Sequence, residues 1–306
     1  MVFPLEPDRL YVTDGGLETS LIHKQGLELR EFAAFELLCG PDGHDELARY
    51  FAPYVALARE RSLGMVVDTA TWRANPDWAS TLGYSTWALA ELNGRAVDLA
   101  REVAAGLDGL PAVVDGVVGP RGDGYVVDDA MSPEEAADYH AAQVAVLARD
   151  GVDLVSAITM NYVEEGVGVA LAAAAAGVPA VISFTVETDG RLPTGQTLHE
   201  AVEQVDAATG SSPAYFMVNC AHPTHFARAL DAEGPWRERI GGLRANASRM
   251  SHAELDASED LDDGDPSELG ALHRDLRTRL PGVQVLGGCC GTDERHVTAI
   301  ADAWLR

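Results

Sequence analysis

A regular alternation of apolar runs of strand length with helical segments most constrains the fold of this chain. Helical segments such as 133–149, which Ser132 caps and a proline opens, and 163–176 lie between the apolar runs. Eight successive βα units predict an α/β protein, a single (β/α)8 TIM barrel that spans residues 1–306 as one domain. The eight candidate strands are 10–13, 65–69, 112–118, 152–157, 180–185, 215–219, 240–244 and 283–286.

The alternative to a closed barrel is a doubly wound open sheet, which needs a glycine-rich phosphate loop after its first strand. The segment 14–19, Asp-Gly-Gly-Leu-Glu-Thr, lacks the GxGxxG spacing of such a loop. In a barrel the active site lies at the carboxyl ends of the strands. Polar residues or glycines end the apolar runs at 14–16, 68–69, 119–120, 159–161, 185–187, 219–220 and Asn246.

Charge and hydropathy exclude several kinds of partner. The 306 residues include 22 basic and 48 acidic ones, giving a net charge of −26, which disfavours nucleic acids and anionic membranes. The longest apolar stretch, 167–184, is broken by Gly177 and Pro179 and predicts a helix and a strand rather than a membrane span. Residues 1–8 lack the features of a secretory signal, which predicts a cytoplasmic protein. The expected partners are small molecules. Oligomeric state is not predicted.

Two adjacent cysteines framed by glycines, Cys289 and Cys290 within 285–292, predict a thiophilic metal, with zinc as the expected ion. Neighbouring side chains of a regular strand face opposite sides, so both thiols can bind one ion only where glycines let the backbone leave strand geometry. Zinc with an open position for chemistry normally keeps three protein ligands. Cys220, directly after the run 215–219, is the candidate third ligand. Strands six and eight of a barrel contribute to the same interior layer, so the sulfurs can converge.

Other roles for these side chains stay open at this point. His222 and His225 are rival metal ligands, because their spacing to Cys220 and to each other is short enough to share an ion. A disulfide between Cys289 and Cys290 would be strained. Cys39 is expected to be a small buried hydrophobe.

The acidic segment 254–268 holds eight carboxylates and no basic residue. Its acids and glycine do not follow the spacing of a calcium-binding loop. The segment is therefore expected to be a solvated surface loop.

Three motifs together resemble the homocysteine S-methyltransferase family. They are Asp-Gly-Gly-Leu-Glu-Thr at 14–19, Asn-Cys at 219–220 and Gly-Gly-Cys-Cys-Gly-Thr at 287–292. The resemblance implies a TIM barrel whose Zn²⁺ is held by Cys220, Cys289 and Cys290, with an acceptor thiol as fourth ligand. It also implies methyl transfer to that sulfur, which yields methionine when the thiol is homocysteine.

The expected contacts to the substrate lie at the barrel mouth. They are Asp14, Gly15, Gly16, Thr159, Asn219 and Asn246, with Glu187 as a further candidate. The sequence departs from the family in one place. Relatives carry a glutamate beside the residue aligned with Thr159, and it helps to bind the amino group of homocysteine, whereas this chain has Ile158. One ammonium anchor is missing, which leaves open a different acceptor thiol or Glu187 as a substitute.

The methyl donor is expected to be a free sulfonium, S-methylmethionine or S-adenosylmethionine. Relatives that use folate or cobalamin carry extra domains, for which 306 residues leave no room beyond the barrel. Trp72, Trp78, Tyr125 and Tyr162 follow candidate strands and could face a sulfonium by cation–π attraction or serve only in packing.

Two other functions remain possible from the sequence. One is a zinc hydrolase, which three thiolate ligands disfavour. The other is a catalytically silent zinc-binding or redox module.

Overall fold

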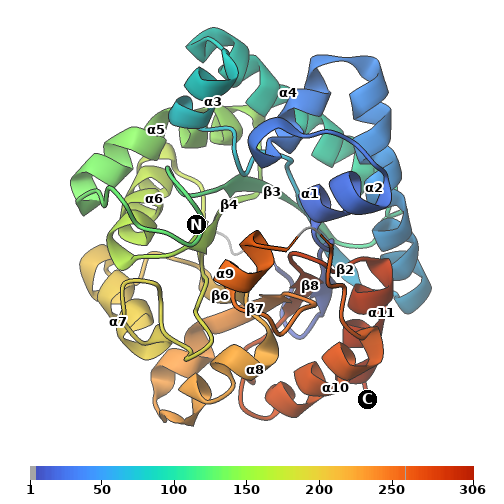
Figure 1. Ribbon diagram of the computed structural model, residues 1–306, viewed down its shortest axis with the longest axis vertical. Helices are drawn as coiled ribbons and strands as arrows, with labels where there is room; N and C mark the ends of the chain where they lie inside the picture. Colours follow the sequence, from blue (N-terminus) through green and yellow to red (C-terminus); the bar gives the residue numbers. More distant parts are fainter. Residues whose placement is uncertain (1–4, 259) are drawn as a thin grey trace.

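In the computed structural model, which describes residues 5–258 and 260–306, eight parallel strands form a closed barrel in sequence order (Figure 1). The strands are β1 (Tyr11–Val12), β2 (Gly64–Asp68), β3 (Ala112–Val118), β4 (Leu154–Met160), β5 (Ala180–Phe184), β6 (Tyr215–Asn219), β7 (Ile240–Ala245) and β8 (Val285–Gly288). The barrel closes where Tyr11 of β1 pairs with Val285 of β8. The predicted (β/α)8 barrel is thereby confirmed.

The longer helices surround the strands on the outside of the barrel, and the short α9 (His252–Asp256) lies over its carboxyl end (Figure 1). The α-helices are α1 (Leu17–Thr19), α2 (Pro41–Arg61), α3 (Pro76–Leu82), α4 (Thr86–Ala105), α5 (Pro133–Asp150), α6 (Val163–Ala176), α7 (Leu198–Thr209), α8 (Pro223–Phe226), α9 (His252–Asp256), α10 (Pro266–Arg277) and α11 (Glu294–Trp304). Helix α5 begins at Pro133 as predicted, because Ser132 and Glu135 form a reciprocal capping box.

Most strand boundaries lie within two residues of the predicted ones, and two strands, β4 and β8, run on beyond their predicted ends toward the barrel mouth. Strand β4 was expected to end at residue 157 but continues to Met160, with a register shift between Ala157 and Met160. Thr159 has a φ of 67° within this stretch, so the backbone kinks instead of leaving the sheet. Strand β8 runs on to Gly288 and delivers the next two residues directly to the barrel mouth.

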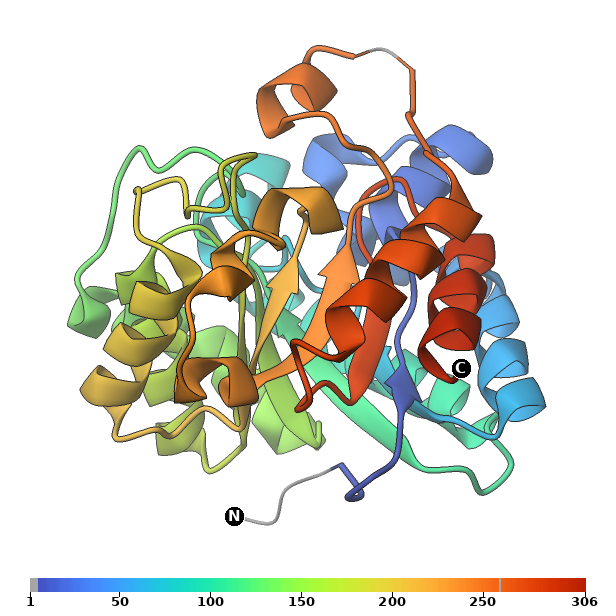
Figure 2. The ribbon, with the colours of Figure 1, turned by 90° about the horizontal axis from the view of Figure 1, so that it is seen from below.

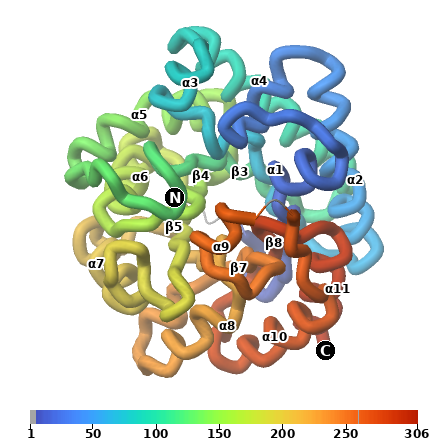
Figure 3. The backbone as a smooth tube through the Cα atoms, viewed as in Figure 1, coloured from blue at the N-terminus to red at the C-terminus, as the bar shows by residue number. Residues whose placement is uncertain are grey.

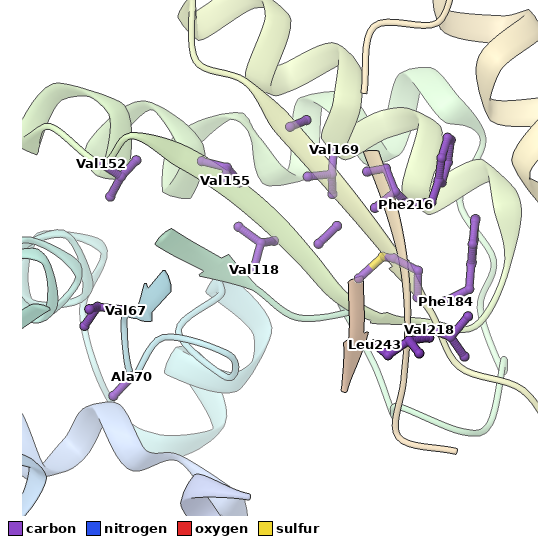
Figure 4. Close-up of a cluster of buried hydrophobic side chains, with 14 of the residues drawn as sticks. Val67, Ala70, Val118, Val152, Val155, Val169, Phe184, Phe216, Val218 and Leu243 are labelled. Atoms are coloured by element: carbon purple, nitrogen blue, oxygen red, sulfur yellow. The ribbon is translucent and has the colours of Figure 1, made fainter. Parts of the chain in front are cut away.

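The hydrophobic core has two layers. One fills the barrel and includes Val66, Leu154 and Met217. The other lies between the strands and the helices, where Phe184 and Phe216 stack with ring centroids 6.3 Å apart (Figure 4). Because side chains fill the barrel interior, the space for a ligand lies at the carboxyl ends of the strands.

The carboxyl end of the barrel is covered on one side by α9 and the acidic segment after it (Figures 2 and 3). Most described residues of this segment are exposed, as expected of a solvated loop. Several contacts nevertheless hold it to the rest of the protein: for example, Ser248 donates to Asp262 at 2.6 Å, and Arg295 pairs with Asp263 at 2.7 Å. The segment therefore covers part of the carboxyl end of the barrel.

Some expectations fall at the edge of what the structure describes or outside it. Residues 1–4 of the segment searched for a signal, and Glu259 of the acidic segment, lie outside the described residues. In the described part, no helix is both long and apolar enough to cross a membrane. The prediction for Cys39 was wrong: it ends the 3-10 helix Ala34–Cys39 and is exposed, with Sγ 3.4 Å from the Tyr84 hydroxyl.

Candidate functional site

Three cysteine sulfurs meet at the barrel mouth. Cys220 directly follows β6, while Cys289 and Cys290 directly follow β8. Their Sγ atoms all lie within 4.8 Å of one another, and those of Cys220 and Cys290 are 3.7 Å apart. Two sulfurs bound at 2.3 Å to one tetrahedral zinc ion would be about 3.8 Å apart. The donor set and its spacing therefore fit a thiophilic metal ion.

Backbone geometry turns these side chains toward each other. Cys220 has a φ of 52°, a left-handed conformation that is uncommon for a residue with a side chain. The backbone N–H of Cys289 donates to Ala245 at 2.9 Å, which fixes the turn after β8 against β7. A Cβ atom added to Gly16 would lie 2.6 Å from the carbonyl oxygen of Cys289. The glycine motif near the amino terminus is thus needed so that the first βα turn can pack against the cysteine turn.

Charge within the cluster is concentrated on one sulfur. Hydrogen bonds from Cys289 and Cys290 hold the pKa of Cys220 well below its ordinary value, and the Tyr125 hydroxyl contributes in the same direction. The hydrogen bond between Cys289 and Cys220 raises the pKa of Cys289 to about 12. A cluster that already stabilises a thiolate is suited to bind a cation, which would replace the shared protons.

Asn219 connects the cluster with the neighbouring strands. Its amide accepts from the backbone N–H of Thr159 at 3.0 Å and from the Ser183 hydroxyl at 2.6 Å. It donates to the Thr159 hydroxyl at 2.8 Å and lies 3.8 Å from the Sγ of Cys289. Asn219 and Thr159, both predicted as site residues, therefore help to position the cysteine cluster, and Thr159 also lines the cavity.

Three side chains, those of Thr185, Asn246 and His252, form hydrogen bonds to the carbonyl oxygen of Cys220. Asn246 donates to it at 3.1 Å, and the Nε2 of His252 lies 2.7 Å from it. The other ring nitrogen of His252 is 3.3 Å from Glu187. Asn246 thus contacts Cys220 directly, and Glu187 contacts it through His252. Both were expected to contact the substrate, but neither is among the residues lining the cavity.

A buried ion-pair network lies beside the sulfurs. Arg244 on β7 pairs with Asp14 at 2.5 Å and also with Asp68, and the Tyr50 hydroxyl donates to Asp14 at 3.0 Å. Burial raises the pKa of Asp14 to about 7, although the attraction of Arg244 lowers it. The Asp14 carboxylate therefore reaches the cavity already paired. Sequence reasoning did not single out Arg244, because its partners lie far away along the chain.

A cavity of about 230 Å³ opens onto the cysteine cluster. This volume suits a small molecule. Gly15, Gly16 and Ile158 form parts of its wall. Its charged lining residues are Asp14, Glu18, Asp68, Asp123, Asp256, Arg73 and Arg244.

The four aromatic residues considered for a sulfonium donor have different positions. Tyr125 lies at the cluster: its hydroxyl donates to the Sγ of Cys220 at 3.4 Å, and its ring stacks on His252 with centroids 3.9 Å apart. Trp72 and Trp78 instead hold a cation of the protein itself, Arg73. Tyr162 lies away from this cavity, with its hydroxyl bonded to the Met131 backbone.

The rival histidines do not join the cysteines. The Nδ1 of His222 is 2.7 Å from the Thr224 hydroxyl, and the Nε2 of His225 is 2.9 Å from the Arg249 carbonyl oxygen. Among the described residues, only Cys220, Cys289 and Cys290 form a group that could hold a metal ion.

The fold and the site define the class of protein: a TIM barrel with a three-cysteine candidate metal centre at its carboxyl end. The family model described as homocysteine S-methyltransferase matches residues 11–304. The chain therefore belongs to the homocysteine S-methyltransferase family of enzymes.

Solved structures with a similar fold include those of the homocysteine methyltransferase MmuM from Escherichia coli. Its metallated form is 21% identical, with a TM-score of 0.72, and its oxidized form is 20% identical, with a TM-score of 0.76. Each comparison covers 97% of this chain and 96% of the other. At this identity the likeness supports the fold.

Proposed function

We propose that the protein is a zinc-dependent S-methyltransferase that moves a methyl group from a sulfonium donor to a thiol, with homocysteine favoured as acceptor. S-methylmethionine and S-adenosylmethionine are the favoured donors. The observation that carries the proposal is the convergence of three cysteine sulfurs within 4.8 Å at the mouth of a small cavity. Three thiolates match a catalytic zinc site that keeps its fourth position open.

Cys220, Cys289 and Cys290 would hold the zinc ion, which when bound would lower the pKa of an acceptor thiol. A lone pair of the acceptor sulfur then forms a bond to the methyl carbon, while the bond between that carbon and the donor sulfonium breaks. The donor leaves as a neutral thioether, and the thiol proton has already been released on binding. The walls of the cavity would have to hold both partners so that the methyl carbon lies in line between the two sulfur atoms.

The electrostatics of the cavity favour a cationic donor. Its lining contains more carboxylates than guanidinium groups, and the cysteine cluster adds negative charge. A sulfonium gains from this field, and the reaction removes its charge. Tyr125, which bonds to Cys220, forms the side of the cavity nearest the sulfurs.

The acceptor is the less constrained partner. Ile158 is 6% exposed and belongs to the apolar layer inside the barrel, so it offers no ammonium contact. A thiol other than homocysteine is the alternative acceptor that this residue favours. We also propose that residues 1–306 make up one domain and that it works in the cytoplasm, where a reducing environment keeps the three thiols free.

An assay of the zinc-loaded protein with methyl-labelled S-methylmethionine or S-adenosylmethionine and a panel of thiols tests the function. Transfer of label to homocysteine, lost on chelation, is the expected result. Transfer to another thiol alone would establish the alternative acceptor. Absence of transfer from either donor to any thiol would leave a metal-binding module and contradict the proposal.

Replacing Tyr125 with phenylalanine is expected to lower activity or zinc affinity by roughly 10- to 100-fold, the usual effect of removing a hydrogen bond to a metal ligand. The hydroxyl that donates to Cys220 is lost, while the ring that stacks on His252 stays. Zinc affinity and turnover are measured together. Tyr162→Phe is the matched control, because that hydroxyl bonds to Met131 outside the cavity. Equal effects of the two changes would contradict the role of Tyr125.

A further inference from the structure

Arg73 is an arginine built into the cavity wall. Its guanidinium lies between two indole rings, 4.3 Å from the centroid of Trp72 and 4.0 Å from that of Trp78. Its Nη1 donates to the carbonyl oxygen of Gly122 at 2.8 Å, and the residue is only 9% exposed. These contacts fix the plane of the guanidinium before any ligand arrives.

This buried cation forms no ion pair in the described part of the chain, although Asp123 and Glu18, two carboxylates of the same cavity, attract it from a greater distance. Among the described residues, no carboxylate oxygen lies within 4.0 Å of the Arg73 guanidinium, and its Nε is buried without a hydrogen bond. Arg244, the other arginine of the cavity, pairs with both Asp14 and Asp68. Burial of an unpaired charge costs free energy, and it lowers the pKa of Arg73. An anion in the cavity would offset that cost.

Glu18 provides an unpaired anion in the same cavity. It lies in α1, and within the described part of the chain it forms no ion pair. Burial, together with the charges of Asp14 and Cys289, raises its pKa to about 7, although Arg73 lowers it. Glu18 is thus within electrostatic reach of the sulfur cluster and of Arg73. A cation and an anion, each without an ionic partner, share the wall of one small cavity.

We propose that Arg73 and Glu18 bind the α-carboxylate and the α-ammonium group of an amino-acid substrate whose sulfur points to the cysteine cluster. This inference rests on the proposed function and assigns two specificity-determining residues to it. The planar fork of arginine matches a carboxylate through two parallel hydrogen bonds. Glu18 supplies the ammonium contact that Ile158 cannot make, from a different loop of the barrel mouth.

A binding experiment that needs no turnover tests each contact separately. The zinc-loaded protein is titrated calorimetrically with L-methionine, with its carboxamide, and with 4-(methylthio)butanoate, which lacks the amino group. We expect methionine to bind about 10- to 100-fold more tightly than either analogue. Arg73→Met should abolish the preference over the carboxamide, and Glu18→Gln the preference over the compound without the amino group.

Matched variants control for general damage to the fold. Arg101 also donates to a backbone carbonyl, that of Gly151 at 3.0 Å, but lies outside the cavity, so Arg101→Met should leave both preferences unchanged. Arg73→Lys keeps the charge without the planar fork and should keep part of the carboxylate preference. Unchanged preferences in Arg73→Met and Glu18→Gln, or equal binding of all three ligands by the unmodified protein, would overturn the proposal.

Kinetic measurements then assign the head group to donor or acceptor. If Arg73→Met raises the KM of the thiol alone, the acceptor carries the bound carboxylate; if it raises the KM of the sulfonium alone, the donor does. Selective methionine binding without any methyl transfer would support the amino-acid site and count against the transferase function. The two proposals can therefore fail independently.

Discussion

Replacing Cys289 with serine is expected to lower both zinc affinity and methyl transfer by more than about a hundredfold, since loss of a group that only supports a ligand already costs roughly 10- to 100-fold. The three sulfurs lie within 4.8 Å of one another, so removal of one leaves two thiolates for an ion that needs three. Metal content after dialysis against a competing chelator and the rate of labelled methyl transfer are the measurements.

Cys39→Ser is the matched control, because Cys39 is exposed and bonded to Tyr84 away from the cluster. It should keep one zinc per chain and full activity. The circular dichroism spectrum of Cys289→Ser should stay close to that of the unmodified protein, because the barrel core does not depend on the metal. Full zinc retention in Cys289→Ser would place the third ligand elsewhere.

Replacing Arg244 with methionine is expected to lower the free energy of unfolding by about 3 to 5 kcal/mol, the usual result of removing one partner of a buried ion pair. Arg244 is the counterion of both Asp14 and Asp68, each of which is buried. Denaturant unfolding at fixed zinc concentration measures the loss. The double variant Asp68→Asn/Arg244→Met should recover part of it, because only one unpaired carboxylate then remains.

The loss in Arg244→Met should grow with pH. Burial raises the pKa of Asp14 to about 7 and raises that of Asp68, while Arg244 opposes both shifts. A carboxyl whose folded pKa exceeds its unfolded pKa favours the fold only in its protonated form. Its contribution is complete below about pH 4 and is lost as pH rises through the folded pKa. Without Arg244 the pKa values of Asp14 and Asp68 rise further. The loss of unfolding free energy in Arg244→Met should therefore become larger from pH 4 to pH 8. A deficit that is constant over this range would contradict the assignment.

The sequence was sufficient to predict the parts of the structure that depend on local pattern. Apolar runs located all eight strands, and the helix at 133–149 was marked by the capping residue Ser132. The three cysteines could be grouped because the barrel fixes where β6 and β8 end. The kink at Thr159 was not predictable, since no local pattern marks its positive φ, and nothing in the sequence around Cys39 indicated that it is exposed.

Residues that act through distant partners were missed, or have contacts that the sequence did not indicate. Arg244 owes its role to Asp14 and Asp68, which lie 230 and 176 residues away in the chain. Trp72 was considered as a contact to the donor, but its ring stacks on Arg73. Glu187 was offered as a substrate anchor, yet it contacts His252 behind Cys220. Such pairings follow from tertiary packing, which no local pattern encodes.

The cysteine cluster and the pair Arg73 and Glu18 lie on different segments of the barrel mouth, so the substrate selectivity of this enzyme could change without a change at the cysteines. Strand ends hold the sulfurs, whereas the segment after β2 carries Arg73 and α1 carries Glu18. Loops of a TIM barrel can vary while its strands stay constant. Grafting the segment after β2 from another member of the family would therefore be a route to new substrate selectivity that leaves the reactive centre in place.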